Sequence, residues 1–303
     1  MKRVSAPLTL MGAQFDLRDD NFAPLTIHGH KLHGIDYQLK IASAQIKTAI
    51  ILAALNAEGT TQITGEIHSR DHTERMLSHF GGRVDSDKTK VKISGGQKLK
   101  GNKMVVPSDP STAAFWLAAA ALVPKSEIVM ENISLNPSRT GFAEVLKRMS
   151  VQIKTQVTQL EPEPMGIIQA TYSDLKGITV EAKEVPSLID EIPLIAVLAT
   201  QAHGTTLVEG AEELRVKESD RLEAIAQNLR AMGIKIEVRP DGFKIEGPQK
   251  LKGAKIESFH DHRIAMAFSI AGLVAEGETQ INNSECVGIS YPEFFKTLRE
   301  LTR

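Results

Sequence analysis

Four copies of one tripeptide, Leu-Lys/His-Gly, divide the sequence and constrain its fold more than any other feature. The copies begin at Leu32, Leu99, Leu175 and Leu251, so their spacing is on the order of 70 residues, which is typical of a repeat architecture. After each copy the pattern predicts a short strand, a polar helix start, an Ala-rich apolar helix, a tight turn and a second strand. A second helix and a β-ribbon complete most copies, so each repeat is predicted to be one β-α-β-α-β-β unit.

The burial expected of the helices gives the architecture. The first strands are expected at 37–41, 104–106, 178–180 and 254–256, the apolar helices at 43–57, 111–123, 190–202 and 261–275, and the second strands at 61–63, 127–129, 206–208 and 279–281. The first helices are apolar on nearly all sides and should be buried, whereas the amphipathic second helices should lie outside. This predicts an inside-out α/β barrel in which the helix starts gather at one end. Helix starts carry partial positive charge and free N–H groups, so such a ring of them is an anion site.

The repeat count predicts two lobes, with a boundary near residues 106–108. Residues 1–106 hold one and a half units and form a partial first lobe, and residues 107–303 hold three units and form the second lobe. The chain opens inside a unit, because residues 1–11 have the pattern of a second helix with no first helix before it. We therefore expect the N-terminal lobe to be incomplete and a segment to be missing before Met1.

Composition excludes several classes of protein. The net charge of −1 argues against a dedicated nucleic-acid surface. The longest apolar run, residues 113–123, is far below the roughly 18 residues that a membrane helix needs. The single Cys286 excludes an internal disulfide and a cysteine metal cage, and His262 has no partner at a metal-ligand spacing. No signal peptide follows Met1, so we expect a cytoplasmic protein.

Charged residues cluster at two helix starts between residues 185 and 221. Pro193 lacks an N–H group and belongs in a first helical turn, which places Asp190 at or beside the N-cap. Asp220 and Glu223 fit a capping box, so another helix is expected to begin near Ser219. Each cluster also has a purely structural interpretation. Asp190 can serve only as a cap, and residues 217–221 can form a solvated ion-pair face.

Seven ordered motifs now carry a resemblance to a known family. They are Ser43-Ala44-Gln45-Ile46-Lys47, Ser69-Arg70-Asp71-His72-Thr73-Glu74, Leu135 to Gly141, Leu188-Ile189-Asp190-Glu191, Glu213 to Arg221, Asp261 to Met266, and Ser290 to Phe295. Over the whole chain they resemble the 3-phosphoshikimate 1-carboxyvinyltransferase (EPSP synthase) family, and the forms of the first two are closer to its class II bacterial branch. In that family a Lys-Ser-x-x-x-Arg segment, a Gly-Asn-x-Gly-Thr loop and an Arg-Pro pair precede the position of Met1. Their absence here implies that this chain by itself lacks part of the substrate site.

The resemblance implies a reaction and a fold. The reaction is transfer of an enolpyruvyl group from phosphoenolpyruvate to the 5-hydroxyl of shikimate 3-phosphate, with release of phosphate, in the shikimate pathway to chorismate and the aromatic amino acids. The fold is the two-lobed one of the enolpyruvyl transferases. The family uses no metal and no organic cofactor. The expected partners are these two small substrates, with no nucleic acid and no membrane, and the expected state is a monomer.

The same resemblance assigns the site residues. It implies that shikimate 3-phosphate is bound by Ser43, Ala44, Gln45, Arg70, Asp190 and Lys217, and that phosphoenolpyruvate is bound by Gln45, Arg221 and Arg263. Asp190 would accept the proton of the 5-hydroxyl, and Glu218 would exchange a proton with the methylene carbon. General chemistry agrees, because two carboxylates in different settings can divide acid and base roles, and planar guanidinium forks suit phosphate and carboxylate.

Two other functions remain open from the sequence. One is the sister enolpyruvyl transferase that acts on UDP-N-acetylglucosamine. It normally presents a catalytic cysteine in a mobile loop, whereas Cys286 lies in the C-terminal part of this chain. The other is a non-catalytic, truncated fragment that binds a ligand or a partner. An assay with and without a supplied N-terminal segment separates an enzyme from a fragment.

Overall fold

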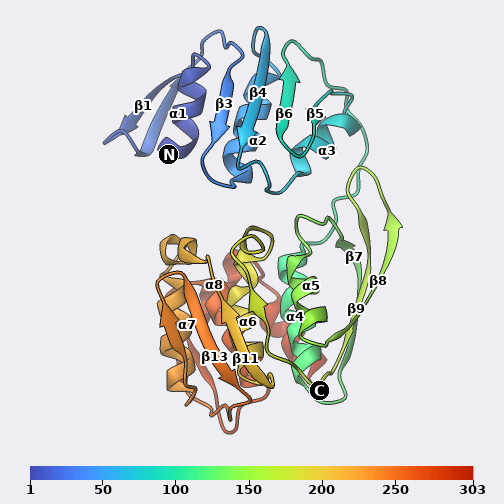
Figure 1. Cartoon of the computed structure of the whole chain (residues 1–303), viewed down its shortest axis with the longest axis vertical. Coiled ribbons are helices and arrows are strands. Elements are labelled where there is room, and N and C mark those ends of the chain that lie inside the picture. The colour runs from blue at the N-terminus through green and yellow to red at the C-terminus, as the bar shows by residue number, and fades with distance from the viewer. Residues whose placement is uncertain (303) are drawn as a thin grey trace. The chain divides into compact units, whose positions relative to one another are not determined.

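The computed structural model describes residues 1–302, and they fold into two compact units (Figure 1). Unit 1 consists of Met1–Val106 together with the short segment Gln159–Pro164, and unit 2 consists of Pro107–Thr158 and the chain from Met165 onward. The sequence-based boundary gave residues 159–164 to the second lobe, whereas the structure groups this hairpin tip with unit 1. Arg303, the last residue of the expected second lobe, lies outside the described residues.

Unit 1 is built around one apolar helix. Its elements are α1 (Lys2–Leu10), β1 (Gln14–Arg18), β2 (Phe22–His28), β3 (Asp36–Leu39), α2 (Ala44–Ala54), β4 (Thr60–Gly65), α3 (His72–His79), β5 (Asp85–Ser86) and β6 (Lys90–Ser94). The strands β1 and β2 form an antiparallel hairpin, and the other strands form a mixed sheet in the order β3-β4-β6-β5. The apolar side of α2 packs on this sheet, and Ile46, Ile50 and Ile51 lie in the core.

Unit 2 repeats the same plan. Its first part contains α4 (Pro110–Leu122), β7 (Glu127–Ser134), α5 (Gly141–Arg148), β8 (Gln152–Gln159), β9 (Met165–Thr171), β10 (Thr179–Val180), η1 (Val185–Ser187), η2 (Ile189–Glu191), α6 (Ile192–Ala199) and β11 (Gly204–Val208). Its second part contains η3 (Glu212–Val216), α7 (Arg221–Ala231), β12 (Glu237–Arg239), β13 (Gly242–Gly247), β14 (Lys255–Glu257), α8 (His262–Gly272), β15 (Gln280–Asn282), η4 (Ser284–Ile289) and α9 (Phe294–Leu301). The sheet order β10-β11-β13-β12 repeats the order β3-β4-β6-β5 of unit 1.

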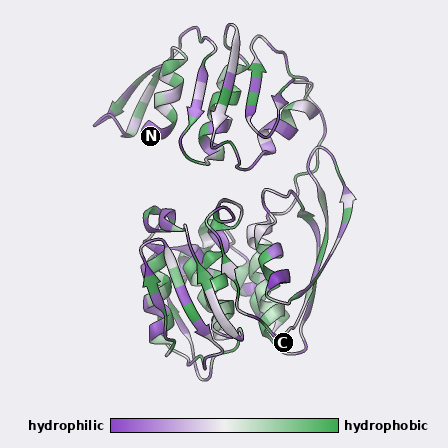
Figure 2. Cartoon of the chain, in the orientation of Figure 1, coloured by the Kyte–Doolittle hydropathy of each residue, from purple (hydrophilic) through white to green (hydrophobic). Residues whose placement is uncertain are grey.

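The core of unit 2 is a set of three buried helices, α4, α6 and α8, which contact one another. Every residue of α6 is buried. The apolar composition of the three helices is visible in Figure 2. The strands of unit 2 form three separate sheets, β7-β9-β8, β10-β11-β13-β12 and β14-β15. This confirms the expected mixed α/β fold with buried first helices. Among the described residues, no helix is both long enough and apolar enough to cross a membrane.

There is a steric reason for the glycine in the repeated tripeptide. A Cβ atom added to Gly34, Gly177 or Gly253 would lie 2.1, 2.4 or 2.3 Å from a backbone carbonyl oxygen of the chain that leads into the second strand. In each case the N–H of that glycine also donates to a carbonyl of this second segment, at 2.7–2.8 Å. Only glycine allows two backbones to approach this closely. The repeat therefore marks the point where the first and second strands of a unit meet.

The second repeat departs from the plan. Gly101 has nothing within 4 Å of the position of a Cβ, and residues 104–106, which were predicted to form a strand, have no regular structure. The unit keeps the bond from the N–H of Lys100 to the carbonyl of Phe80, at 2.8 Å, and an isolated bridge between Ser108 and Ile133. The prediction of a strand at 104–106 was wrong, because this segment pairs with β7 only at Ser108, two residues after the apolar run.

Candidate active site

The start of α8 holds the most buried acid of unit 2. Asp261 is the N-cap of α8, and its Oδ1 accepts the backbone N–H of Arg263 at 2.9 Å. Its Oδ2 accepts from the Ser219 hydroxyl at 3.1 Å and from Nε of Arg221 at 2.7 Å. Burial alone would raise the pKa of Asp261, but the hydrogen bond and charge of Arg221 outweigh burial and lower that pKa below its usual value. Asp261 therefore stays ionised as the anchor of Arg221.

Arg221 is the first residue of α7, and its side chain is only 1% exposed. Besides Asp261, its guanidinium contacts Glu218 through Nη2 at 2.6 Å and Asp190 through Nη1 at 3.4 Å. Burial by itself would lower the pKa of Arg221, but the bond to Asp261 and the three carboxylate charges raise it instead. One buried cation thus holds three carboxylates from three different segments in fixed positions.

Asp190 lies between two guanidinium groups. Its Oδ1 is 3.4 Å from Nη1 of Arg221, and its Oδ2 is 3.6 Å from Nη2 of Arg263. The expectation that Asp190 sits at or beside the N-cap of its helix is refined by the structure. Glu191 is the N-cap of α6, and Asp190 belongs to the short 3₁₀ turn η2 before it. Pro193 lies in the first turn of α6, as predicted. The side chain of Asp190 therefore contacts the arginines at the neighbouring helix starts.

Glu191 is a buried acid on the far side of Arg263. Its Oε1 lies 3.8 Å from Nη1 of Arg263, and this oxygen has no hydrogen-bond partner in the described part of the chain. Burial raises the pKa of Glu191 above its usual value, and the charge of Arg263 and a hydrogen bond with Ser111 oppose this only in part. Arg139 contacts the same serine: its Nη2 donates to the Ser111 hydroxyl at 2.9 Å and also contacts Asp109.

The remaining predicted residues of unit 2 are more exposed. The side chain of Glu218 is 51% exposed although it contacts Arg221, so a ligand can reach it. Lys217 lies beside it and approaches Glu213 at 3.9 Å. His262, next to Arg263, has its pKa lowered by burial and by the charge of Arg263, which favours the neutral imidazole. The structure thus joins Asp190, Glu218, Arg221 and Arg263 in one cluster.

In unit 1 the predicted residues lie around the start of α2. Ser43 is the N-cap, and its hydroxyl accepts the backbone N–H of Ile46 at 3.4 Å, while Ala44 opens the helix. Gln45 is exposed, and Arg70 is half-buried in the loop between β4 and α3. A helix start that presents N–H groups, an amide and a guanidinium nearby is suited to a phosphate. This set belongs to unit 1, whereas the Asp190 cluster belongs to unit 2.

Sequence reasoning missed Asp261 and Glu191 as members of the cluster. The signal for Asp261 was available, because an aspartate before a helix is the same signal that identified Asp220 as a cap. Asp220 does cap α7, where its Oδ1 accepts the N–H of Glu223 at 3.1 Å, and the helix begins at Arg221. What the sequence could not supply was the partner of Asp261, which lies 40 residues away in the chain.

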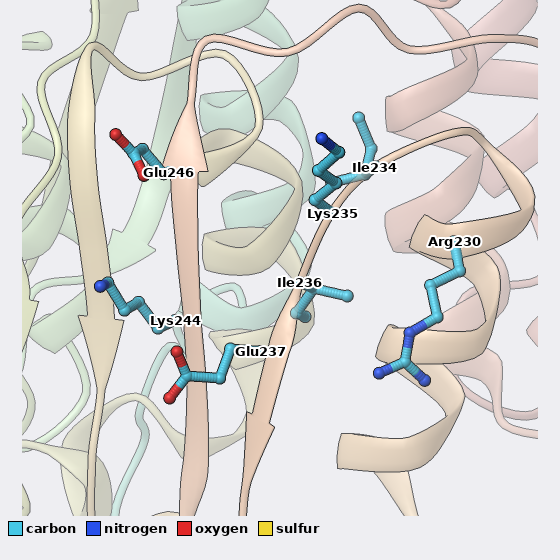
Figure 3. A pocket seen from close by; sticks show the side chains of 7 residues that line it. All are labelled: Arg230, Ile234, Lys235, Ile236, Glu237, Lys244 and Glu246. Carbon is cyan, nitrogen blue, oxygen red and sulfur yellow. The ribbon is translucent and has the colours of Figure 1, made fainter.

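A hollow elsewhere on unit 2 has a different character. It is lined by residues at the end of α7, in the segment that joins α7 to β12, and on β12 and β13, shown in Figure 3: Arg230, Ile234, Lys235, Ile236, Glu237, Lys244 and Glu246. Glu237 and Lys244 are directly opposite each other on the two antiparallel strands. Opposite charges paired across strands are typical of a solvated sheet face. We therefore do not assign a catalytic role to this hollow.

Comparison with known proteins first defines the class. The enolpyruvyl transferase NikO from Streptomyces tendae matches 99% of this chain and 71% of its own with a TM-score of 0.78, at 16% sequence identity. This likeness shows that the fold is that of an enolpyruvyl transferase. A solved structure of EPSP synthase from Acinetobacter baumannii is more similar, with a TM-score of 0.90 and 42% identity over 99% of this chain and 70% of that one.

The family follows from the sequence comparison. The profile of the EPSP synthase (3-phosphoshikimate 1-carboxyvinyltransferase) family matches residues 1–298, and the chain belongs to this family. The 3-phosphoshikimate 1-carboxyvinyltransferase of Carboxydothermus hydrogenoformans is 49% identical over 304 residues, which cover 100% of this chain and 71% of that protein. The enzyme of the same name from Alkaliphilus oremlandii is 47% identical, with the same coverage.

Proposed function

We propose that this chain carries out enolpyruvyl transfer from phosphoenolpyruvate to the 5-hydroxyl of shikimate 3-phosphate, which yields 5-enolpyruvylshikimate 3-phosphate and phosphate. The observation that carries the proposal is the cluster in which Asp190 lies between Arg221 and Arg263, 3.4 and 3.6 Å away, in a chain of the EPSP synthase family. A carboxylate set between two guanidinium groups provides both a proton acceptor and the donors that an anionic substrate needs.

Asp190 is proposed as the base. Its carboxylate is fixed from both sides by arginines, yet 17% of its side chain remains exposed, so a substrate hydroxyl can reach it. Glu218 is proposed as the group that exchanges a proton with the methylene carbon of phosphoenolpyruvate. It is the more exposed of the two acids and is oriented by its 2.6 Å contact with Arg221. The two acids therefore have different settings, as a division of acid and base roles requires.

The phosphoenolpyruvate site is proposed at Arg263 of unit 2, with Arg221 behind it, and the part expected of Gln45 remains a prediction from the family resemblance. Arg263 is 16% exposed and Arg221 is 1% exposed, so Arg263 is the fork that a ligand meets first. Its contacts with Asp190 and Glu191, at 3.6 and 3.8 Å, are longer than a hydrogen bond. An incoming phosphate or carboxylate can therefore take up the N–H groups of Arg263 in good geometry.

Shikimate 3-phosphate is proposed to bind with its phosphate at the start of α2. Ser43, Ala44 and Gln45 lie in the cap and first turn of that helix, and Arg70 follows the strand β4 that packs beside it. Asp190 and Lys217 are proposed to contact the ring hydroxyls. A monomeric state and a cytoplasmic location also remain predictions, as does the absence of a metal or organic cofactor.

The test measures the release of phosphate from phosphoenolpyruvate in the presence of the full chain. It is run with both substrates, with each substrate alone, and with UDP-N-acetylglucosamine in place of shikimate 3-phosphate. The chain spans about 71% of the length of the Carboxydothermus relative, so each reaction is repeated with an N-terminal segment of a relative added. Release that needs both substrates in either series supports the proposal. Release with the nucleotide sugar, or none in either series, contradicts it.

A further inference from the structure

The apolar helix α2 carries one lysine, Lys47, whose ammonium group lies inside unit 1. Its side chain is 2% exposed, and its Nζ is 2.7 Å from Oε1 of Glu74, which is 9% exposed. Lys47 and Glu74 form a buried ion pair, and neither residue has a role in the reaction proposed above. Sequence reasoning did not predict this pair, because a lysine in a helix is usually at the surface.

The ammonium group of Lys47 donates hydrogen bonds to the loop that leads to Arg70. After β4 ends at Gly65, the chain makes two tight turns, in which the N–H of Ile67 donates to Gly65 and the N–H of Ser69 donates to Ile67, each at 2.8 Å. Three-residue turns of this kind are common at strand ends. Nζ of Lys47 donates to the carbonyl oxygens of Ile67 at 3.3 Å and Ser69 at 3.5 Å. The second carbonyl belongs to the residue just before Arg70.

The acid of the pair comes from a third segment. Glu74 lies in the first turn of α3, where a negative charge is also favoured by the helix dipole. One side chain of α2 therefore ties together the end of the β4 loop and the start of α3, on the two sides of Arg70. A 2.6 Å hydrogen bond also joins α2 to α3 between the hydroxyls of Thr48 and Thr73, the residue after Lys47 and the residue before Glu74.

Stability alone is a weak explanation for this pair. Removing two charges from water usually offsets most of what a buried ion pair gains, and an apolar pair of equal size is often as stable or more so. In the described part of the chain, Oε2 of Glu74 and the hydroxyl of Ser69 have no hydrogen-bond partner, which adds to the cost. An apolar pair would fill the same space but could not donate to the carbonyls of Ile67 and Ser69.

We propose that Lys47 is a positioning residue, whose ammonium group holds the loop before Arg70 so that the Arg70 guanidinium is placed beside the start of α2. This inference rests on the proposed role of Arg70 in binding shikimate 3-phosphate. Lys47 does not contact the ligand in this proposal. It fixes the backbone from which the binding residue projects, and Glu74 supplies the counter-charge to the buried ammonium group.

The experiment compares two variants of the full chain. In K47M/E74M both charges are replaced by apolar groups of similar length, so no buried charge is left unpaired. In E74D the carboxylate, the ammonium group and its bonds to the two carbonyls all remain. Amide hydrogen exchange is measured for residues 68–72, with the strand β6 as internal reference, and shikimate 3-phosphate binding is measured by calorimetry. Exchange needs no ligand, so it reports on the loop even if the proposed function fails.

We expect exchange of residues 68–72 to be about tenfold faster in K47M/E74M, with β6 unchanged, and shikimate 3-phosphate to bind about tenfold more weakly. E74D, which leaves no buried charge unpaired, should stay within about twofold of the parent chain in both measurements. Arg70→Ala should weaken binding without changing exchange, which separates the role of Arg70 from that of Lys47.

Several outcomes would overturn the proposal. Parent-like exchange in K47M/E74M would mean that Lys47 only fills space. Equally fast exchange in E74D, which keeps both charges and the lysine, would assign the effect to packing of the Glu74 side chain and not to the ammonium–carbonyl bonds. If the apolar pair does not fold, K47Q/E74Q, which removes the charges but keeps polar side chains, takes its place with the same criteria. Parent-like binding despite a loosened loop would overturn the positioning role while leaving the loop contact intact.

Discussion

Replacement of Asp261 by asparagine tests the buried centre of the site. Asp261→Asn keeps a side-chain oxygen for the N–H of Arg263, so the cap of α8 is retained, but it removes the charge that faces Nε of Arg221 at 2.7 Å. Arg221 is 1% exposed, and leaving a buried charge without its partner typically costs 3–5 kcal/mol. Because Glu218 and Asp190 still contact the guanidinium, we expect the lower end, about 3 kcal/mol of unfolding free energy.

The chain offers a matched control in Asp220. It is also a helix N-cap with an arginine partner, at 3.0 Å, but both side chains of this Asp220–Arg215 pair are about one third exposed or more. Asp220→Asn should therefore cost less than about 1 kcal/mol, because solvent screens an exposed pair. Denaturant unfolding of the two variants and the parent chain measures the difference. Equal losses in the two variants would refute the argument that burial of Arg221 makes its partner important.

The dependence of this loss on pH has a definite sign. The pKa of Asp261 is lowered in the folded chain, so its stabilising effect is present above the ordinary value of 3.8 and is lost as the pH falls through the lower folded pKa. The gap between the parent chain and Asp261→Asn should stay constant from neutral pH down to about 4 and shrink below it. A gap that shrinks near neutral pH would indicate that another group is responsible.

Three further predictions concern the acids and Arg263. Asp190→Asn should keep shikimate 3-phosphate binding within a few-fold and reduce turnover roughly 100-fold or more relative to the parent chain in the same assay, and near-parental turnover would remove Asp190 as the base. Arg263→Lys should weaken phosphoenolpyruvate by about 1.5–3 kcal/mol in calorimetry and leave shikimate 3-phosphate nearly unchanged; equal losses would indicate a folding defect. The pKa of Glu191 is raised by burial, so the stability of the parent chain relative to Glu191→Gln should fall as the pH rises above 4.5 in unfolding experiments; a constant difference would contradict this.

The sequence predicted the repeated elements well because each has a local cause. The apolar stretches of α4, α6 and α8 leave no polar face, so burial follows directly. Pro193 and Asp220 marked the starts of α6 and α7, because a missing N–H and a capping side chain act within a few residues. These features depend only on residues close together in the chain, so a local sequence pattern is enough to predict them.

The parts that were missed depend on distant partners. From the sequence alone, Asp261 is interpreted as an ordinary helix cap, and only the structure shows its contact with Arg221. Likewise, Lys47 is expected at the surface, and only the structure shows its buried contact with Glu74. Asp190 and Glu191 are adjacent acids, and the sequence alone did not determine which of them caps the helix after an extra turn of 3₁₀ structure. Burial of a charge depends on how distant segments of the chain pack together, so no local sequence pattern predicts it.

The second tripeptide, whose glycine no other backbone approaches closely, has a practical consequence for protein engineering. At Gly101 the closely approaching backbone that constrains the equivalent glycines is absent, and the next residues, with Val105 and Val106 exposed, form neither helix nor strand. Exposed backbone outside regular structure is where chains tolerate inserted sequence best. A reporter peptide or a flexible linker can therefore be placed between Met104 and Val106, whereas the same insertion after Gly34 or Gly253 would separate two paired strands.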